Sequence, residues 1–181
     1  MPGFTISEFA GRLSTSGLAS PNKFSVEFRN IPVGNGTDRQ LDFLCEQVDI
    51  AGRSVQSVLN VEYGIRREIA YNAPAYNPLS MTFICTGDLK EKRIPDDWNN
   101  MIVDSTKGFD VAYYNDYAKK CELIVNSLYS DGVTKAFSIT YKEIYPKSIQ
   151  SLQLNHSTQN TTLRVTAEFQ YAFFETDDIK L

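Results

Sequence analysis

The sequence is poor in the side chains that most enzyme and metal sites require. Its 181 residues include one histidine, His156, and three cysteines. A single imidazole leaves no second histidine for a zinc pair or for a His-Glu-x-x-His motif. Three cysteines cannot all pair within one chain, and they are typical of reduced intracellular thiols rather than of a secreted disulfide framework. We therefore expect no metal, no cofactor and no catalytic residue.

Long apolar runs and an excess of positive charge are also missing. No apolar stretch approaches the roughly 18 residues of a membrane span, and residues 1–8 have neither the basic nor the apolar region of a secretory signal. We expect no contact with a membrane. Lysine and arginine number 18 against 22 aspartates and glutamates, so the formal net charge is −4. Such a chain is a poor candidate for wrapping duplex DNA, because cationic side chains supply most of that affinity.

What the sequence does contain is β-strand alternation. Its length fits one domain over residues 1–181, and 42% hydrophobic residues are ordinary for a globular core. Alternating apolar and polar residues predict strands at 24–29, 41–46, 79–85, 121–129, 136–145 and 162–173, with a hairpin turn at 130–132.

Two helices complete the predicted fold. The first covers 7–17 with Ser7 as its cap. The second covers 95–106, with Pro95 in its first turn and an apolar stripe of Trp98, Met101 and Ile102. The predicted fold class is mainly β, a sandwich or barrel with one packed helix and a short N-terminal helix.

Possible chemical motifs have simpler structural explanations. Gly34-x-Gly36 lacks the third glycine and the βαβ context of a dinucleotide site, so we expect a surface turn. Asp96 and Asp97 suit the positive end of the second helix, and Asp131 suits a turn.

The thiols and the densest aromatic run are likewise interpreted as structural. No histidine neighbours the three cysteines in sequence, and two of them lie on apolar strand faces, where free cysteine behaves as a small hydrophobe: Cys45, Cys85 and Cys121. The run Tyr113-Tyr114-Asn115-Asp116-Tyr117 lacks the basic stripe of single-strand nucleic-acid binding. We expect it to pack internally or to contact another subunit.

Residues 51–72 do not resemble the rest of the chain. Strand-forming residues alternate with arginines and glycines, which predicts an extended hairpin bent near Gly64. The stretch has more apolar strand residues than a lone hairpin can bury on its own domain. A long unpaired strand edge can also pair with another chain. The alternative is an ordinary hairpin folded on its own sheet. We predict a subunit interface with an apolar centre and a charged rim at Arg53, Val55, Val58, Val61, Tyr63, Arg66, Arg67 and Glu68.

Several short segments occur in a fixed order through almost the whole chain. After the N-terminal helix come Ser20-Pro21-Asn22-x-Phe24-x-Val26, then Cys45-x-x-x-x-Ile50-Ala51-Gly52, the extended segment 63–71, the helix with Trp98, the run 113–117 and Tyr145-Pro146-x-x-Ile149-x-x-Leu152-x-Leu154. In this order and spacing they resemble the tail tube proteins of contractile-tailed, T4-like bacteriophages. Ala51 departs from the small turn, usually Pro-Gly, of that family.

The resemblance implies a structural virion protein. A β-barrel-like protomer would close into a six-membered ring with a shared lumen, and rings would stack into a tube through which the genome leaves. Its partners would be further copies, the tail sheath protein, baseplate tube-initiating proteins, a tape-measure protein in the lumen, and DNA in transit without specific binding. The tube would be part of the virion tail and would be assembled in the host cytoplasm. Residues 52–71 would then stack one ring on the next.

We predict that the polar, solvent-exposed face of the last strand lines the lumen. A basic lining would hold DNA through its phosphates, whereas a neutral or acidic lining would let it slide. The charges on this face, Arg164 and Glu168, cancel. The predicted lining residues are Thr162, Arg164, Thr166, Glu168 and Gln170.

Two other classes of protein are compatible with the sequence. One is the tube of a related contractile injection or type VI secretion machine, which passes no genome. The other is a small split-barrel flavin enzyme, against which the missing site residues count.

Overall fold

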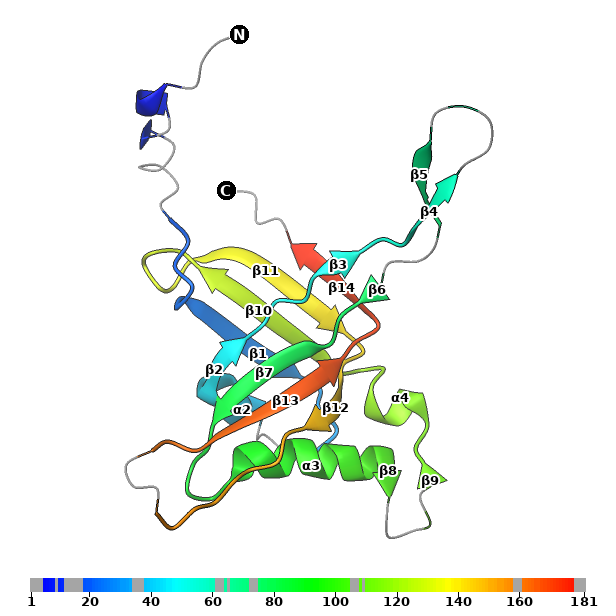
Figure 1. The fold of residues 1–181 in the computed structure, drawn as a ribbon. Coiled ribbons are helices and arrows are strands. Elements are labelled where there is room, and N and C mark those ends of the chain that lie inside the picture. Colours follow the sequence, from blue (N-terminus) through cyan, green and yellow to red (C-terminus); the bar gives the residue numbers. More distant parts are fainter. Residues whose placement is uncertain are drawn as a thin grey trace.

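Two antiparallel sheets of four strands face each other, and a helix closes one end (Figure 1). The computed structural model describes residues 5–8, 10–11, 18–33, 38–60, 64, 66–71, 75–104, 108, 110–157 and 161–177. The first sheet has the order β1 (Phe24–Arg29), β10 (Glu122–Leu128), β11 (Lys135–Lys142), β14 (Phe173–Asp177). The second sheet has the order β12 (Tyr145–Ile149), β13 (Arg164–Gln170), β7 (Leu79–Ile84), β2 (Cys45–Val48).

The two sheets do not join into a closed barrel within the described residues. The protomer is therefore a sandwich, and the mainly β fold class is confirmed. Each sheet ends in two edge strands, which are β1 and β14 in the first sheet and β12 and β2 in the second. An edge strand has unpaired backbone groups and can pair with another chain.

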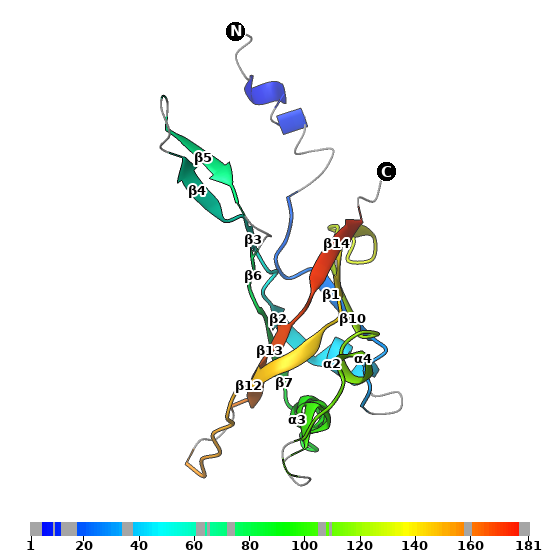
Figure 2. The same cartoon turned by 90° about the vertical axis from the view of Figure 1, so that its right-hand side faces the viewer.

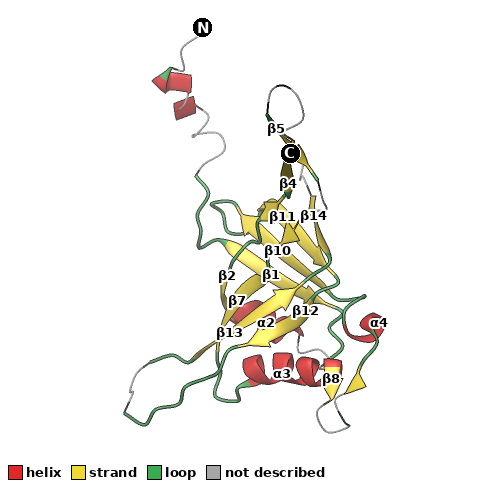
Figure 3. Cartoon of the chain, turned by 45° about the vertical axis from the view of Figure 1, so that its right-hand side comes forward, coloured by secondary structure: helices red, strands yellow, loops and turns green. Residues whose placement is uncertain are grey.

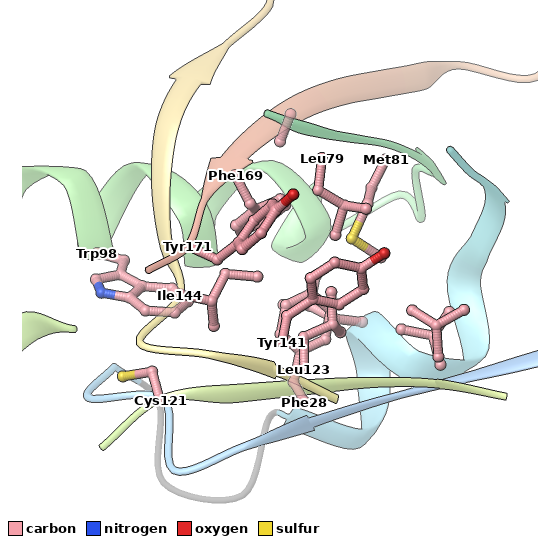
Figure 4. Packing of buried hydrophobic residues seen from close by; sticks show 14 of the residues in the cluster. Phe28, Leu79, Met81, Trp98, Cys121, Leu123, Tyr141, Ile144, Phe169 and Tyr171 are labelled. Atoms are coloured by element: carbon pink, nitrogen blue, oxygen red, sulfur yellow. The ribbon is translucent and has the colours of Figure 1, made fainter. Parts of the chain in front are cut away.

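The core lies between the sheets and follows from the alternation. Phe28 of β1, Phe83 of β7 and Phe169 of β13 are almost completely buried. The ring centroid of Phe28 lies 5.6 Å from that of Phe169 and 6.4 Å from that of Phe83. Figure 4 shows Phe28 and Phe169 among the inward side chains that meet between the two layers. Aromatic rings bury large apolar areas, so this contact is a major source of sandwich stability.

Helix α3 (Lys90–Ile102) closes the lower end of the sandwich in Figure 1. Trp98 is fully buried, and its ring lies 6.4 Å from that of Phe169. Its indole N–H donates to the carbonyl of Tyr117 at 3.0 Å. The apolar stripe predicted this packing, although Met101 of the same stripe is partly exposed.

The predicted bounds of this helix are wrong at both ends. It begins at Lys90, so Pro95 lies inside it and not in its first turn. The cause is Glu91, whose buried carboxylate accepts the N–H of Thr86 at 2.9 Å and the hydroxyl of Thr86 at 3.0 Å. These bonds fix the preceding loop, where Leu89 takes a left-handed φ of 51°. At the other end the helix stops at Ile102 and is followed by β8 (Val103–Asp104), which pairs with β9 (Asp110–Val111).

The predicted strand 41–46 is mostly helix. Residues Asp38–Leu44 form α2, and the strand β2 starts at Cys45. Leu41 is buried while Phe43 is 83% exposed, so they do not share a face as strand alternation requires. The carboxylate of Asp42 accepts the N–H of Phe28 at 2.8 Å, which ties the helix to β1.

Two predicted long strands are each divided between the sheets. The segment 136–145 leaves the first sheet after Lys142 and enters the second at Tyr145, with Glu143 at a left-handed φ of 57°. The segment 162–173 leaves the second sheet after Gln170, and β14 joins the first. The two crossings are linked, because the N–H of Ala172 donates to the carbonyl of Lys142 at 3.1 Å.

The remaining elements are short. In the N-terminal part, residues 6–8 and 10–11 are helical, while the other residues of the predicted helix 7–17 lie outside the described residues. Thr5, not Ser7, precedes these helical residues, and its N–H donates to the Glu8 carboxylate at 3.3 Å. The small ladders and the last helix are β3 (Arg53–Ser54) with β6 (Ala75–Tyr76), β4 (Ser57–Asn60) with β5 (Arg67–Ala70), and α4 (Tyr114–Tyr117).

Replacing Glu91 by alanine should lower the free energy of unfolding by about 1–3 kcal/mol, because Thr86 loses its acceptor in a buried site. Urea denaturation of the protomer measures this. Asp88→Ala is the control in the same loop: Asp88 makes an exposed ion pair with Lys90, and its loss should cost about 0.5 kcal/mol or less. Equal losses in both variants would contradict the anchoring role of Glu91.

Candidate assembly surfaces

A two-stranded arm projects from the sandwich (Figures 1 and 2). The β3–β6 pair forms its base, and the β4–β5 pair continues outward with Ser57 opposite Ala70 and Asn60 opposite Arg67. We use "arm" for residues 53–71. The predicted hairpin is therefore present. An isolated two-stranded hairpin is only marginally stable in water, so the arm is a surface that gains from a partner.

The described side chains of the arm are exposed. Val58 and Ile69 lie opposite each other in the ladder, and each is 48% exposed. Of the predicted interface residues, the structure places Arg53, Val55, Val58, Arg66, Arg67 and Glu68 on the arm, while Val61 and Tyr63 lie outside the described residues. Leu59, Ile69 and Tyr71 add exposed apolar area that the prediction left out.

The base of the arm is fixed by an aromatic cluster in the sandwich. The ring of Tyr76 in β6 lies 5.6 Å from that of Tyr171 and 5.7 Å from that of Phe174. The hydroxyl of Tyr141 accepts the N–H of Ala51 at 3.2 Å. Burial raises the pKa of Tyr171 to about 12 and also raises the pKa of Tyr141, so both rings are neutral at physiological pH. The arm therefore starts from a rigid point.

The outer face of the second sheet is polar, as the alternation predicted. In β13 the side chains of Val165, Ala167 and Phe169 are buried, and the four residues between and beside them face outward. Thr166 shares a hydrogen bond of 3.1 Å with Thr82 of β7. The five predicted lumen residues, Thr162, Arg164, Thr166, Glu168 and Gln170, thus belong to one face and its margin.

Hydrogen bonds balance the positive charge on this face. Arg164 makes two bonds to the carboxylate of Glu46, one from Nη2 at 2.9 Å and one from Nε. The same contact lowers the pKa of Glu46 and raises the pKa of Arg164. Glu168 accepts the hydroxyl of Ser148 at 3.0 Å. Because Glu46 neutralises Arg164, the net charge of Glu46, Arg164 and Glu168 together is the single negative charge of Glu168.

The tyrosine run packs internally at one end and is exposed at the other. Tyr114, Tyr117 and Tyr145 form edge-to-face pairs with centroid distances of 5.5 to 6.5 Å. Burial and a hydrogen bond to Glu143 raise the pKa of Tyr114. Tyr113, which precedes the helix, is 83% exposed. The expected internal packing holds for two tyrosines of the run, Tyr114 and Tyr117, which contact Tyr145 of β12, whereas Tyr113 is exposed.

The sandwich, the arm and the polar face can now be compared with known proteins. The family model of phage tail tube proteins matches residues 19–177. The chain belongs to the phage tail tube protein family. No curated protein sequence matches it. The family resemblance found in the sequence is therefore confirmed, and the chain is a structural tail tube subunit of a phage tail or phage-tail-like particle.

Solved structures of contractile machines share the fold of this tail tube protein. A chain in the anti-feeding prophage baseplate has a TM-score of 0.65 at 13% identity, over 91% of this chain and 98% of that chain. A chain in the extended sheath–tube complex of an extracellular contractile injection system has a TM-score of 0.60 at 11% identity, over 97% of this chain and 99% of that chain. At these identities the similarity is one of fold.

The candidate chemical groups of the tail tube protein lie in structural settings. Burial raises the pKa of Cys45 and of Cys121 to about 12 and also raises the pKa of Cys85. Since the thiolate is the reactive form, these thiols are poor nucleophiles. His156 is exposed in a loop. Within the described ranges, no group of three potential metal-ligating residues forms and no helix is long and apolar enough to cross a membrane.

The carboxylates singled out in the sequence also have structural partners. Asp96 and Asp97 lie in the middle of α3, not at its start as predicted, and pair with Lys92 and Arg93 one turn earlier. Asp131 holds its turn by accepting the N–H of Val133 and of Thr134, both at 2.9 Å. Gly34 and Gly36 lie outside the described residues.

Alanine at Cys45, Cys85 or Cys121 should leave tube assembly intact. Each change removes packing, on the order of 1 kcal/mol for a small buried side chain, and at Cys45 and Cys121 also a weak hydrogen bond from the thiol to a backbone carbonyl. Cys121 should show the largest fall in thermal midpoint because it is the most buried. Calorimetry and electron microscopy of each variant measure stability and assembly. A single variant that assembled normally but lost tube function would reveal a role for that thiol.

Proposed function

We propose that this protein forms six-membered rings that stack into the tail tube of a contractile-tailed phage, the channel for genome ejection inside a contractile sheath. The observation that carries the proposal is the exposed, partly apolar arm on a protomer that belongs to the tail tube family. If the subunit buried the apolar surface of its arm against its own sandwich, Val58, Ile69 and Tyr71 would not be exposed to solvent.

The arm is suited to connect successive rings. It extends beyond the sandwich on the side away from α3 (Figures 1 and 3). Its valines, Ile69 and Tyr71 supply an apolar centre, while Arg53, Arg66 and Arg67 supply charges that fix register. Burying apolar surface yields roughly 25 cal/mol per Å², and a ring repeats the contact in every subunit.

The polar face of the second sheet is suited to line the channel. It holds hydroxyl, amide and paired charged groups, and among Glu46, Arg164 and Glu168 the uncompensated charge is that of Glu168. DNA phosphates would find no unpaired arginine among the β13 residues, so passing DNA would not be held. The tape-measure protein would occupy the same space before ejection.

Further partners follow from the tube. The outside of the tube would contact the sheath protein, and the first ring would dock on baseplate tube-initiating proteins. Assembly would take place in the host cytoplasm, and the finished tube would be a part of the virion. The alternative is the tube of a contractile injection system, which the shared fold with two such chains favours. A particle whose head contains nucleic acid would identify the phage. A particle that has no head with nucleic acid would identify the injection system.

Val58→Asp tests the stacking role of the arm. A carboxylate at this position would be buried without a partner between rings, which costs several kcal/mol per contact, so rings should form while tubes should not. The thermal midpoint of the protomer should stay nearly unchanged, because Val58 is half exposed. Light scattering, negative-stain microscopy and calorimetry are applied to the same sample.

Val58→Thr is the matched control, because it has nearly the same shape without the charge and should weaken stacking far less. A Val58→Asp protein that melts early, yet builds long tubes from its folded fraction, would place the arm in the protomer's own core. A wild-type protein that stays monomeric at every concentration would contradict ring formation itself.

The channel lining is tested with a matched pair of cysteine variants. Glu168→Cys lies on the outer face of the second sheet and Glu175→Cys on the outer face of the first, where Phe174 points inward. After labelling with a maleimide gold cluster, cryo-electron microscopy of Glu168→Cys tubes should show metal along the axis. The Glu175→Cys tubes should not. Gold on the outside of Glu168→Cys tubes would refute the assignment.

A further inference from the structure

The two flanks of the sandwich differ in which elements they present. On one flank lie α2 and the edge strands β1 and β2, and on the other lie α4, the β8–β9 pair and the edge strands β12 and β14 (Figure 1). In the quarter-turned view α4 is in front and α2 lies behind it (Figure 2). We call these flanks the α2 side and the α4 side.

The α2 side carries an exposed aromatic ring beside a groove. Phe43 is 83% exposed although it is a large apolar residue. It lines an open groove of about 630 Å³ together with Phe24, Val26 and Cys45. Two cations, Arg39 and Lys135, lie at the same groove, with Glu27 and Asp42. Asp42 is already engaged by the N–H of Phe28, and Glu27 by Arg29.

The α4 side carries an exposed apolar patch of similar character. Val111 is 67% and Tyr113 83% exposed. Val103 lies opposite Val111 in the β8–β9 ladder, Tyr114 follows Tyr113, and both are partly exposed. The patch is held firmly, because Tyr114 packs on Tyr117 and Tyr145. Asp110 and Asp116 lie next to the apolar residues, and Lys119 and Lys120 follow α4.

We propose that the α2 side of one protomer binds the α4 side of the next, with Tyr113 entering the groove beside Phe43. This rests on the proposed ring and names the surfaces that close it. Two different patches on opposite flanks of one molecule give a head-to-tail contact, which closes into a ring when the rotation fits. A patch that bound only the sheath would need no counterpart on the other flank.

The edge strands of the first sheet, β1 and β14, favour a second copy as the occupant, because neither contains a proline that would prevent pairing across the contact. Each flank ends both sheets, so a neighbouring copy brings β12 and β14 to β2 and β1. In the second sheet β12 contains Pro146 and a register shift between Pro146 and Ser148. Proline cannot donate to a strand ladder and protects an edge from backbone pairing. Specificity at this contact therefore depends on side chains such as Phe43 and Tyr113.

Charge supports the same pairing. Arg39 lies one helical turn before Phe43, and Asp110 precedes Val111 in the β8–β9 pair. Both rims carry charges of both signs, and in the proposed contact Arg39 of one protomer would lie opposite Asp110 of the next. Such complementarity sets register and excludes wrong pairings more than it adds affinity.

The test uses two variants that each damage one side, Phe43→Asp and Tyr113→Asp. Both side chains are exposed, so both variants should keep the wild-type thermal midpoint. Under conditions where the wild type forms rings, each variant alone should be monomeric by light scattering and mass photometry. An equimolar mixture should form dimers and nothing larger, because it contains a single kind of intact contact.

The controls separate this proposal from the proposed function. Val58→Asp, on the arm, should form rings but no tubes. Rings that survive in Phe43→Asp or Tyr113→Asp, or a mixture that stays monomeric, would overturn the pairing of these two sides while leaving the tube intact. A wild type that never forms rings would overturn the ring and this contact together.

Discussion

The packing of Phe169 against two partners holds the described parts of the protomer together. Its ring meets Phe28 of the opposite sheet at 5.6 Å and Trp98 of α3 at 6.4 Å, so one side chain joins both layers and the helix. Trp98 extends the contact through its hydrogen bond to Tyr117 of α4. Because these contacts use the inner faces, the arm and the outer faces of the two sheets do not contribute to this packing.

The sequence predicted strands well where a strand keeps one sheet throughout, as β1, β7 and β10 do. Alternation is a local signal and does not tell which sheet a strand joins, so it missed the two crossings between sheets. After Tyr171 the inward side changes from odd to even positions, which exposes Phe173 and packs Phe174. Helix α2, which contains Leu41, was not predicted for a related reason. It is held by its tertiary contact with β1, and a local sequence pattern does not report such a contact.

The assembly surfaces were predictable to different degrees. The arm could be found because its mixture of valines, arginines and glycines fits no self-contained sheet, and the polar face of β13 follows directly from alternation. Phe43 and Val111 gave no such signal. A single apolar residue in a sequence is expected inside, and only the fold shows that Phe43 faces water while Leu41, two residues earlier, is buried.

The slender arm also has a consequence for the kinetics of polymerisation. A hairpin of four residues per strand, joined to the sandwich by a two-residue ladder, is weakly ordered by its own contacts. In the proposed tube, docking on a neighbouring ring would supply the missing contacts and offset the ordering entropy at that moment. The first ring-to-ring contact would then be the slow one, and addition to an end that already presents a docking surface would be fast. Growth of this kind would start most readily at a template, and the template would then determine where and how many tubes begin.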